Sequence, residues 1–331
     1  MPHTWDFLTR IALSKPYLAA WRALCWLRRP HIYTGDRVVL TRTIFGHWMY
    51  IDASDASVAP GLLIRGYWEI PATRVLLRLL RPGMRYVEVG SNVGYFTLLA
   101  SSRVGPDGRV FAFEANPRLA DLARRSLSVN GVLCARVEAM AVCEQSGAAT
   151  LHVPAYHLGE GNLYSPAHPF AQGYATQPAA KLEVPATTLD DYFADDPAPV
   201  DLLRIDAEGS EPAILAGARE LLARSPSIKI ILELSPALIR QGGRDPEQFL
   251  ESLYRDGFQA QEISGGGLVP YAYRESPDPR SAGVDLLLEH RRSGPAAGFN
   301  PPAAPRNTTL PAQDLGSTAG SPRSRASGTA R

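Results

Sequence analysis

The sequence has few cysteines and no long apolar run. Its three cysteines, Cys25, Cys134 and Cys143, have neither a metal-binding spacing nor the even number of a disulfide framework, which is typical of reduced thiols in the cytoplasm. No stretch of about 18 consecutive apolar residues occurs, so we expect no membrane-spanning helix. The first 20 residues mix charges and Pro16 with apolar residues, which does not resemble a secretory signal. We therefore expect a cytoplasmic protein.

The sequence also lacks a surplus of either charge. Its 34 basic and 33 acidic residues give a formal net charge of +1, so we expect no nucleic-acid partner, which would require a basic surface. Hydrophobic residues make up 45% and charged residues 20%, as in ordinary globular proteins. A length of 331 residues suits one α/β domain of about 200 residues with appendages.

The two ends of the chain differ from its centre. Residues 4–29 mix tryptophan and leucine with arginine, a composition that can lie on an anionic membrane surface as short helices. Packing on the core or on a partner subunit is the alternative. Residues 291–331 are rich in Pro, Ala, Gly, Ser and Thr, which predicts a disordered tail. We expect an N-terminal helical and β extension over 1–80, which includes a β-hairpin over 38–52, and a catalytic domain over 81–290.

Within the domain, short apolar runs alternate with helical patterns, as in a parallel sheet covered by helices. The helices are expected at 71–80, 95–103, 119–129 and 211–223, and the strands at 86–89, 110–113, 135–142, 202–206, 228–234 and 284–289. Residues 154–180 interrupt the alternation between strand-like segments at 149–153 and 182–184. A loop of this length is usually functional, and we expect it to bind the substrate. His152, His157 and His168 lie in or beside it, where a histidine could act as a base.

A glycine-containing turn, Glu88-Val89-Gly90-Ser91-Asn92-Val93-Gly94-Tyr95, joins the first of these strands to a helix. Glycines allow the backbone to approach a ligand, and the helix N-terminus favours an anionic group. A dinucleotide-binding turn would have glycine in place of Asn92 and a third glycine further on. Their absence favours a ligand without a pyrophosphate, such as S-adenosylmethionine.

Glu114 follows Gly94 by twenty residues, at the end of the next strand, where an acid can accept hydrogen bonds from ribose hydroxyls. The order of strand, turn, helix, strand and acid predicts a site for S-adenosylmethionine. The residues expected to bind it are Glu88, Gly90, Ser91, Asn92, Gly94, Tyr95, Glu114 and Asn116.

Asp206, Glu208 and Glu211 follow the fourth strand, at the sheet edge where α/β proteins bind ligands. Asp206 or Glu208 could act as the general base for an alcohol if burial raises its pKa. The acids could instead hold the substrate or cap the following helix. Together with Glu233 they could hold Mg²⁺, but no spacing fixes such a site and we predict no metal.

Four segments in this order resemble the FkbM family of methyltransferases: Gly90-x-Asn92-x-Gly94, Phe113-Glu114-Ala115-Asn116-Pro117, the stretch 188–193 and the stretch 201–211. The resemblance covers about residues 67–234. It implies the class I methyltransferase Rossmann-like fold, an α/β fold whose seven-stranded, mostly parallel sheet has an antiparallel last strand and helices on both faces. It also implies O-methylation of a hydroxyl on a saccharide or natural product. Arg204 stands where the family commonly has lysine, which changes the hydrogen-bond geometry there.

The sequence therefore predicts an S-adenosylmethionine-dependent O-methyltransferase with a small-molecule or glycan acceptor. An NAD-dependent oxidoreductase on the same layered fold is one alternative, which Asn92 and the missing glycine disfavour. A non-catalytic scaffold that keeps the cofactor fold at a membrane is another, since a fold alone does not fix a function.

The N-terminal composition gives a first prediction, peripheral contact with the inner membrane surface. Residues 4–29 carry five basic side chains against Asp6, and each basic residue near an anionic leaflet contributes about 1 kcal/mol. In liposome co-sedimentation at low salt, the full chain should bind anionic vesicles more strongly than a chain that starts at His31. Equal binding of the two would assign these residues to packing.

Overall fold

The computed structural model describes residues 30–164, 179–274 and 283–290, all within a compact unit of residues 1–291. The predicted helices within 4–29, the tail over 291–331 and residues 165–178 of the predicted substrate loop lie outside the described residues. The proposed domain boundaries stay a prediction. None of the helices in the described ranges is long and apolar enough to cross a membrane.

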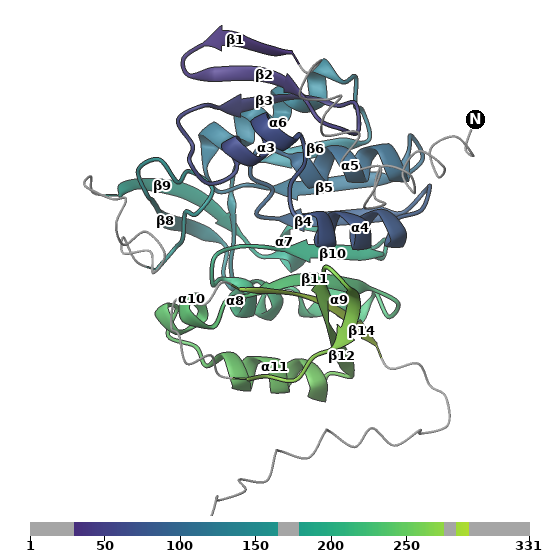
Figure 1. The fold of residues 1–331 in the computed structure, drawn as a ribbon. Coiled ribbons are helices and arrows are strands. Elements are labelled where there is room, and N and C mark those ends of the chain that lie inside the picture. The colour runs from purple at the N-terminus through teal and green to yellow at the C-terminus, as the bar shows by residue number, and fades with distance from the viewer. Residues whose placement is uncertain (1–29, 165–178, 275–282, 291–331) are drawn as a thin grey trace, which may run out of the picture. The chain divides into compact units, whose positions relative to one another are not determined.

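A central sheet organises the described residues, with the strand order β13-β12-β14-β11-β10-β4-β5-β6 (Figure 1). Five neighbouring strands run parallel, and β14 lies antiparallel to β11. In sheet order from β6, the strands are β6 (Ala135–Glu138), β5 (Arg109–Phe113), β4 (Arg85–Val89), β10 (Leu202–Ile205), β11 (Lys229–Leu234), β14 (Val284–His290), β12 (Phe258–Ser264) and β13 (Gly267–Pro270). The predicted Rossmann-like fold with an antiparallel last strand is confirmed.

The sheet has eight described strands where the resemblance implies seven. The additional strand is β13, a four-residue edge strand. Gly265 and Gly266 turn the chain tightly after β12, so that β13 pairs back along it in antiparallel register. A hairpin with a glycine turn needs few residues, which explains how the edge gains a strand without a crossover.

Helices cover both faces of this sheet, because alternate residues of each parallel strand point to opposite sides. Tyr86 packs into one core and its neighbour Val87 into the other, and both side chains are fully buried. The first core includes residues of α4 (Ile70–Leu79), α5 (Tyr95–Val104) and α6 (Pro117–Val129). The second includes residues of α7 (Leu189–Tyr192), α8 (Glu211–Ala216), α9 (Arg219–Ala223), α10 (Pro236–Gln241) and α11 (Pro246–Arg255).

The helix predicted over 211–223 is instead two helices, α8 and α9, that meet at Gly217 and Ala218. A Cβ at position 217 would lie 2.5 Å from the carbonyl oxygen of Cys143, so only glycine fits where the backbone passes Cys143. The Asp190 carboxylate accepts hydrogen bonds from the backbone N–H groups of Glu220 and Leu221. A carboxylate distant in sequence thus caps the second helix.

The strand predicted over 135–142 is also divided. β6 ends at Glu138, whose carbonyl oxygen accepts a hydrogen bond from the N–H of Glu114, the residue after β5. The chain then enters a separate sheet, where β7 (Ala141–Val142) pairs in parallel with β9 (Ala180–Thr187). β9 pairs antiparallel with β8 (Gly147–Val153), so the strand-like segments that flank the predicted loop form a hairpin.

The predicted β-hairpin over 38–52 is confirmed as β2 (Val38–Arg42) and β3 (Trp48–Asp52), to which β1 (His31–Gly35) adds a third antiparallel strand. β3 packs against α6 (Figure 1). Arg118 of α6 forms ion pairs with Asp36 and with the buried Asp52. A further helix that the periodicity does not predict, α3 (Ala59–Arg65), follows this sheet.

Two glycines with nearly equal backbone angles provide a test of the close approach at the first turn. Gly90 has φ +84°, and a Cβ there would lie 1.7 Å from the carbonyl oxygen of Asp206, whereas Gly83 has φ +82° and open space. Gly83→Ala should cost about 1 to 2 kcal/mol for its left-handed conformation. Gly90→Ala should cost about 1 to 3 kcal/mol more from overpacking. Denaturant unfolding of both variants measures this, and equal losses would contradict the close approach.

Candidate active site

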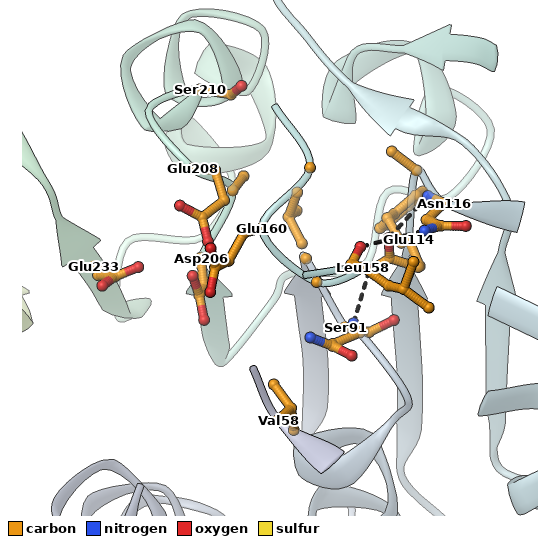
Figure 2. Close-up of a pocket in the computed structure, with 18 of the residues that line it drawn as sticks. Val58, Ser91, Glu114, Asn116, Leu158, Glu160, Asp206, Glu208, Ser210 and Glu233 are labelled. Carbon is orange, nitrogen blue, oxygen red and sulfur yellow. Dashed lines mark hydrogen bonds between the residues drawn. The ribbon is translucent and has the colours of Figure 1, made fainter. Parts of the chain in front are cut away.

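A cavity of about 360 Å³ opens at the carboxyl ends of the central parallel strands. The turn after β4 and the segment after β5 form one side, with Ser91, Glu114 and Asn116. Asp206, Glu208 and Glu233, from the ends of β10 and β11, lie on the other side, as Figure 2 shows. This is the edge at which the sequence places its site, so the two predicted groups share one cavity.

The turn after β4 is held by hydrogen bonds within the protein. The N–H groups of Gly90 and Ser91 both donate to the carbonyl oxygen of Phe113 at 2.9 and 3.0 Å, and the N–H of Asn92 donates to Glu114 at 2.7 Å. Asn92 adopts a left-handed conformation with φ 51°, which asparagine tolerates better than most residues. The sequence predicts that the glycines let the backbone approach a ligand; in the structure, Gly90 lies against the backbone carbonyl of Asp206, which leaves no space for a side chain.

Glu114 links this turn to the helix after β5. One of its carboxylate oxygens accepts from the Asn92 N–H and the other from the Asn116 N–H, at 2.7 and 2.8 Å. Burial raises the pKa of Glu114 to about 7, although the two backbone hydrogen bonds oppose the shift. Each carboxylate oxygen can accept more than one hydrogen bond, so Glu114 keeps acceptor capacity toward the cavity. Asn116 caps α6 by accepting from the Arg118 N–H.

Not every residue predicted to bind the cofactor lines the cavity. Gly90, Ser91, Asn92, Tyr95, Glu114 and Asn116 do. Glu88 lies fully buried outside the lining, where it accepts a hydrogen bond from the Thr97 hydroxyl at 2.6 Å. Gly94 packs against α6, because a Cβ there would lie 3.0 Å from that of Ala123. The structure gives these two residues roles in the support of the turn.

Arg204 is the buried cation beneath the cavity. Its guanidinium donates to Asp206 at 2.8 Å and to Glu69 at 3.1 Å, and it lies 3.8 Å from Glu88. The same group stacks over the Phe96 ring at 4.1 Å. Burial raises the pKa values of Glu69 and Glu88 to about 7, while Arg204 opposes both shifts. One arginine of β10 thus contacts the residue before α4, a residue of β4 and Asp206 at the base of the site.

Asp206 and Glu233 meet on the far side of the cavity (Figure 2). Burial raises the pKa of Glu233 well above its usual range, and the charge of Asp206 and a hydrogen bond with it raise it further. Glu208 lines the same side with a left-handed backbone, φ 50°. Glu211 is buried and closes the intervening loop by accepting from the N–H groups of Ala207 and Gly209. Among the described residues, no side chain caps the first N–H groups of α8, so Glu211 supports the loop before this helix, and Asp206 and Glu208 line the cavity.

The residues after β8 cross the mouth of the cavity between its two sides. Leu158 donates its N–H to Asp55 and accepts from the Asn116 amide, at 2.9 and 3.2 Å. A Cβ on Gly159 would lie 2.1 Å from the Asn92 side chain, so this segment rests directly on the first turn. The structure therefore places residues 158–161, part of the predicted substrate loop, in the cavity wall.

Neither His152 nor His157, the two histidines of this region that the structure describes, lines the cavity. His157 contacts Glu160 at 2.9 Å, and Glu160 is the member of that pair in the cavity wall. His152 is buried in β8, and His168 lies outside the described residues. No group of three His, Cys, Asp or Glu side chains in the described ranges is arranged to hold a metal ion.

Sequence reasoning missed several lining residues, among them Trp68, Glu69, Glu160 and Ser235. Trp68 and Glu69 precede α4, outside the repeating pattern of strands and helices. Glu69 has a left-handed backbone, φ 37°, and no sequence motif predicts this conformation. Glu160 lies in the predicted loop, and Ser235 directly follows β11. The position of Ser235 at a strand end is the one signal that could have identified it.

The side formed by β4 and β5 fits S-adenosylmethionine. The Ser91 hydroxyl is buried in the cavity wall with no hydrogen-bond partner among the described residues, which leaves a polar atom for a ligand. A carboxylate in the position of Glu114 is suited to accept hydrogen bonds from ribose hydroxyls. An apolar surface that suits the adenine ring is formed by Val93, Phe113, Met140 and Leu158.

The chain is similar to known methyltransferases. Residues 88–260, more than half of the chain, match the family described as the methyltransferase FkbM domain. The protein-L-isoaspartate O-methyltransferase of Aeropyrum pernix is 32% identical over 117 residues, which cover 35% of this chain and 44% of that protein. That of Methanopyrus kandleri is 45% identical over 51 residues, 15% of this chain and 23% of the relative. The chain thus spans less than half the length of these curated relatives.

Solved structures with a similar course of the chain include the O-methyltransferase TomG from Streptomyces achromogenes, in complex with SAM. It is 16% identical, with 72% of this chain and 88% of that chain covered and a TM-score of 0.41. A SAM-dependent O-methyltransferase from Thermotoga maritima is 13% identical, with 81% and 87% covered and a TM-score of 0.38.

The buried acids predict that the cofactor-free protein loses stability between pH 6.5 and 8.0. Glu69, Glu88 and Glu114 have folded pKa values of about 7, above the value of about 4.3 in unfolded chains. The folded state therefore binds more protons, and the free energy of unfolding falls as pH rises through 7. Burial lowers the pKa of His47 to about 4, and the opposing effect of this residue fades across the window because the unfolded imidazole, with a pKa of about 6.5, loses its proton there.

Glu88→Gln keeps an acceptor for Thr97 and removes one of these titrating groups. Denaturant unfolding should show a slope with pH that is flatter by up to about 1.4 kcal/mol per pH unit, the value for one proton. Glu251→Gln, at an exposed position of α11, is the matched control and should keep the parent slope. Stability that rises over this window, or an unchanged slope in Glu88→Gln, would contradict the assignment.

Proposed function

Because the chain belongs to the FkbM family of S-adenosylmethionine-dependent methyltransferases, we propose that it methylates a hydroxyl oxygen on a saccharide or natural-product acceptor. The observation that carries this proposal is the single cavity that Glu114 and Ser91 share with Asp206, Glu208 and Glu233. One side has the groups that suit the cofactor, and the other has carboxylates that can hold and deprotonate an alcohol.

The cofactor, when bound, supplies an activated methyl group. Ser91 and Glu114 would hold it by hydrogen bonds to its polar groups, and the first turn of α5 adds backbone N–H groups that no helical carbonyl accepts. The apolar lining and the segment 158–161 keep water from the reacting groups. The chief contribution of the chain is then to hold two reactants together in a fixed orientation.

Asp206 is the residue we propose to orient the acceptor hydroxyl and take its proton. The hydrogen bond from Arg204 fixes one carboxylate oxygen, Oδ2. A carboxylate has further acceptor sites for a hydroxyl, and a positioned base typically contributes 10² to 10⁴-fold in rate. Glu208, on the same loop, is the second candidate for this role.

Incubation with methyl-labelled S-adenosylmethionine and a panel of saccharides and hydroxylated natural products tests the proposal. An ether product, stable to mild alkali, is expected. Label that mild alkali releases would indicate a methyl ester, and label on nitrogen would indicate an amine acceptor; both would contradict O-methylation of a hydroxyl.

Two variants should distinguish the roles of the two sides of the cavity. Glu114→Ala should weaken S-adenosylhomocysteine binding ten-fold or more, because hydrogen bonds to a charged acceptor contribute about 1.5 to 3 kcal/mol each. Asp206→Asn should keep this affinity within a few-fold and lower turnover by about 10² to 10⁴. Calorimetry gives the affinities, and thermal unfolding checks that both variants are folded. Full turnover in Asp206→Asn would place the base elsewhere.

A further inference from the structure

The cavity is strongly acidic on its acceptor side. Of the described residues that line it, six are acidic and one, Arg204, is basic. Glu114 belongs to the cofactor side, and the other acids are Glu69, Glu160, Asp206, Glu208 and Glu233. Figure 2 shows four of these, Glu160, Asp206, Glu208 and Glu233, gathered on the side opposite Ser91 and Asn116. Such a surface attracts cations and repels anions.

Arg204 is not available to an anionic ligand. Its side chain is only 4% exposed, and its guanidinium already contacts carboxylates of Glu69, Glu88 and Asp206. A phosphate or carboxylate in this cavity would therefore meet no cation in the described lining that is not already paired. It would also repel the ionised forms of the lining acids, whose charge burial already makes costly at Glu69 and Glu233, where the pKa values are raised.

Ser235 is an independent indication that a polar ligand binds here. It lines the cavity two residues after Glu233, at the end of β11. The residue is 2% exposed, and its hydroxyl oxygen has no hydrogen-bond partner in the described part of the chain. A buried hydroxyl without a partner loses a hydrogen bond that it would make in water, so a ligand that supplies one is favoured.

We propose, on the basis of the proposed function, that the acceptor is an amino sugar, in which an ammonium group accompanies the hydroxyl to be methylated. The ammonium group has three donors and suits the carboxylates of Glu160 and Glu208. The hydroxyl to be methylated faces Asp206, and Ser235 takes part in the hydrogen bonds of the sugar. The single sulfonium charge of the cofactor offsets only part of the acidic excess.

Three probes of one ring size but different charge test this proposal: glucosamine, N-acetylglucosamine and glucuronate. Ligand-observed NMR titrations of the full chain, loaded with S-adenosylhomocysteine at pH 7, give their dissociation constants without turnover. Glucosamine should bind at least about ten-fold more tightly than N-acetylglucosamine, because a hydrogen-bonded charge pair is worth more than a neutral hydrogen bond. Glucuronate should bind most weakly.

Glu160→Gln and Glu208→Gln should each reduce the preference for glucosamine, and together they should abolish it. Glu251→Gln, on the exposed face of α11, removes the same charge outside the cavity and should leave it unchanged. Equal binding of glucosamine and N-acetylglucosamine, tighter binding of glucuronate, or no binding of any probe would overturn the proposal. If the proposal failed in this way but the protein methylated the hydroxyl of an uncharged acceptor in the panel, the proposed function would still hold.

Discussion

The buried guanidinium of Arg204 is the interaction on which the arrangement of the site depends. Glu69, Glu88 and Asp206 come from the position before α4, from β4 and from the end of β10, and without a shared cation their carboxylates would repel one another at close range. Removal of one partner from a buried ion pair is strongly destabilising, because the other charge is left uncompensated. The planar guanidinium reaches several acceptors and also stacks on Phe96, which the ammonium of a lysine could not do equally well.

This constraint reaches the reacting side of the cavity through Asp206. The side chain of Asp206 is held by Arg204, and its backbone carbonyl lies against Gly90. The contact between Gly90 and Asp206 therefore connects the turn after β4 with the acids on the opposite side of the cavity. Glu114 performs the corresponding task between β4 and β5, since it ties the backbone at Asn92 to the start of α6. The cavity is thus preorganised by the protein before any ligand contributes a hydrogen bond.

The concentration of acids has a cost in stability that a ligand can offset. Carboxyl groups at Glu69, Glu88, Glu114, Glu211 and Glu233 all have raised pKa values because burial removes them from water. Functional sites commonly accept such a cost, since groups arranged for a ligand are poorly matched to one another in its absence. A cationic ligand would favour the ionised carboxyl groups and so stabilise the folded protein as well as bind to it.

The sequence by itself determined the layered fold, the order of the main strands and the residues at their carboxyl ends. Fully buried parallel strands require continuous apolar runs, and the turn at Gly90, the acid at Glu114 and the acids after β10 lie next to such runs. Only the tertiary structure decided which of these side chains face the cavity. Glu88 and Glu211 carry the same chemical group as Glu114 and Glu208, but the fold turns them into its interior. It also brought in Glu69, Glu160 and Ser235, because contacts between residues distant in the chain leave no periodic signal in the sequence.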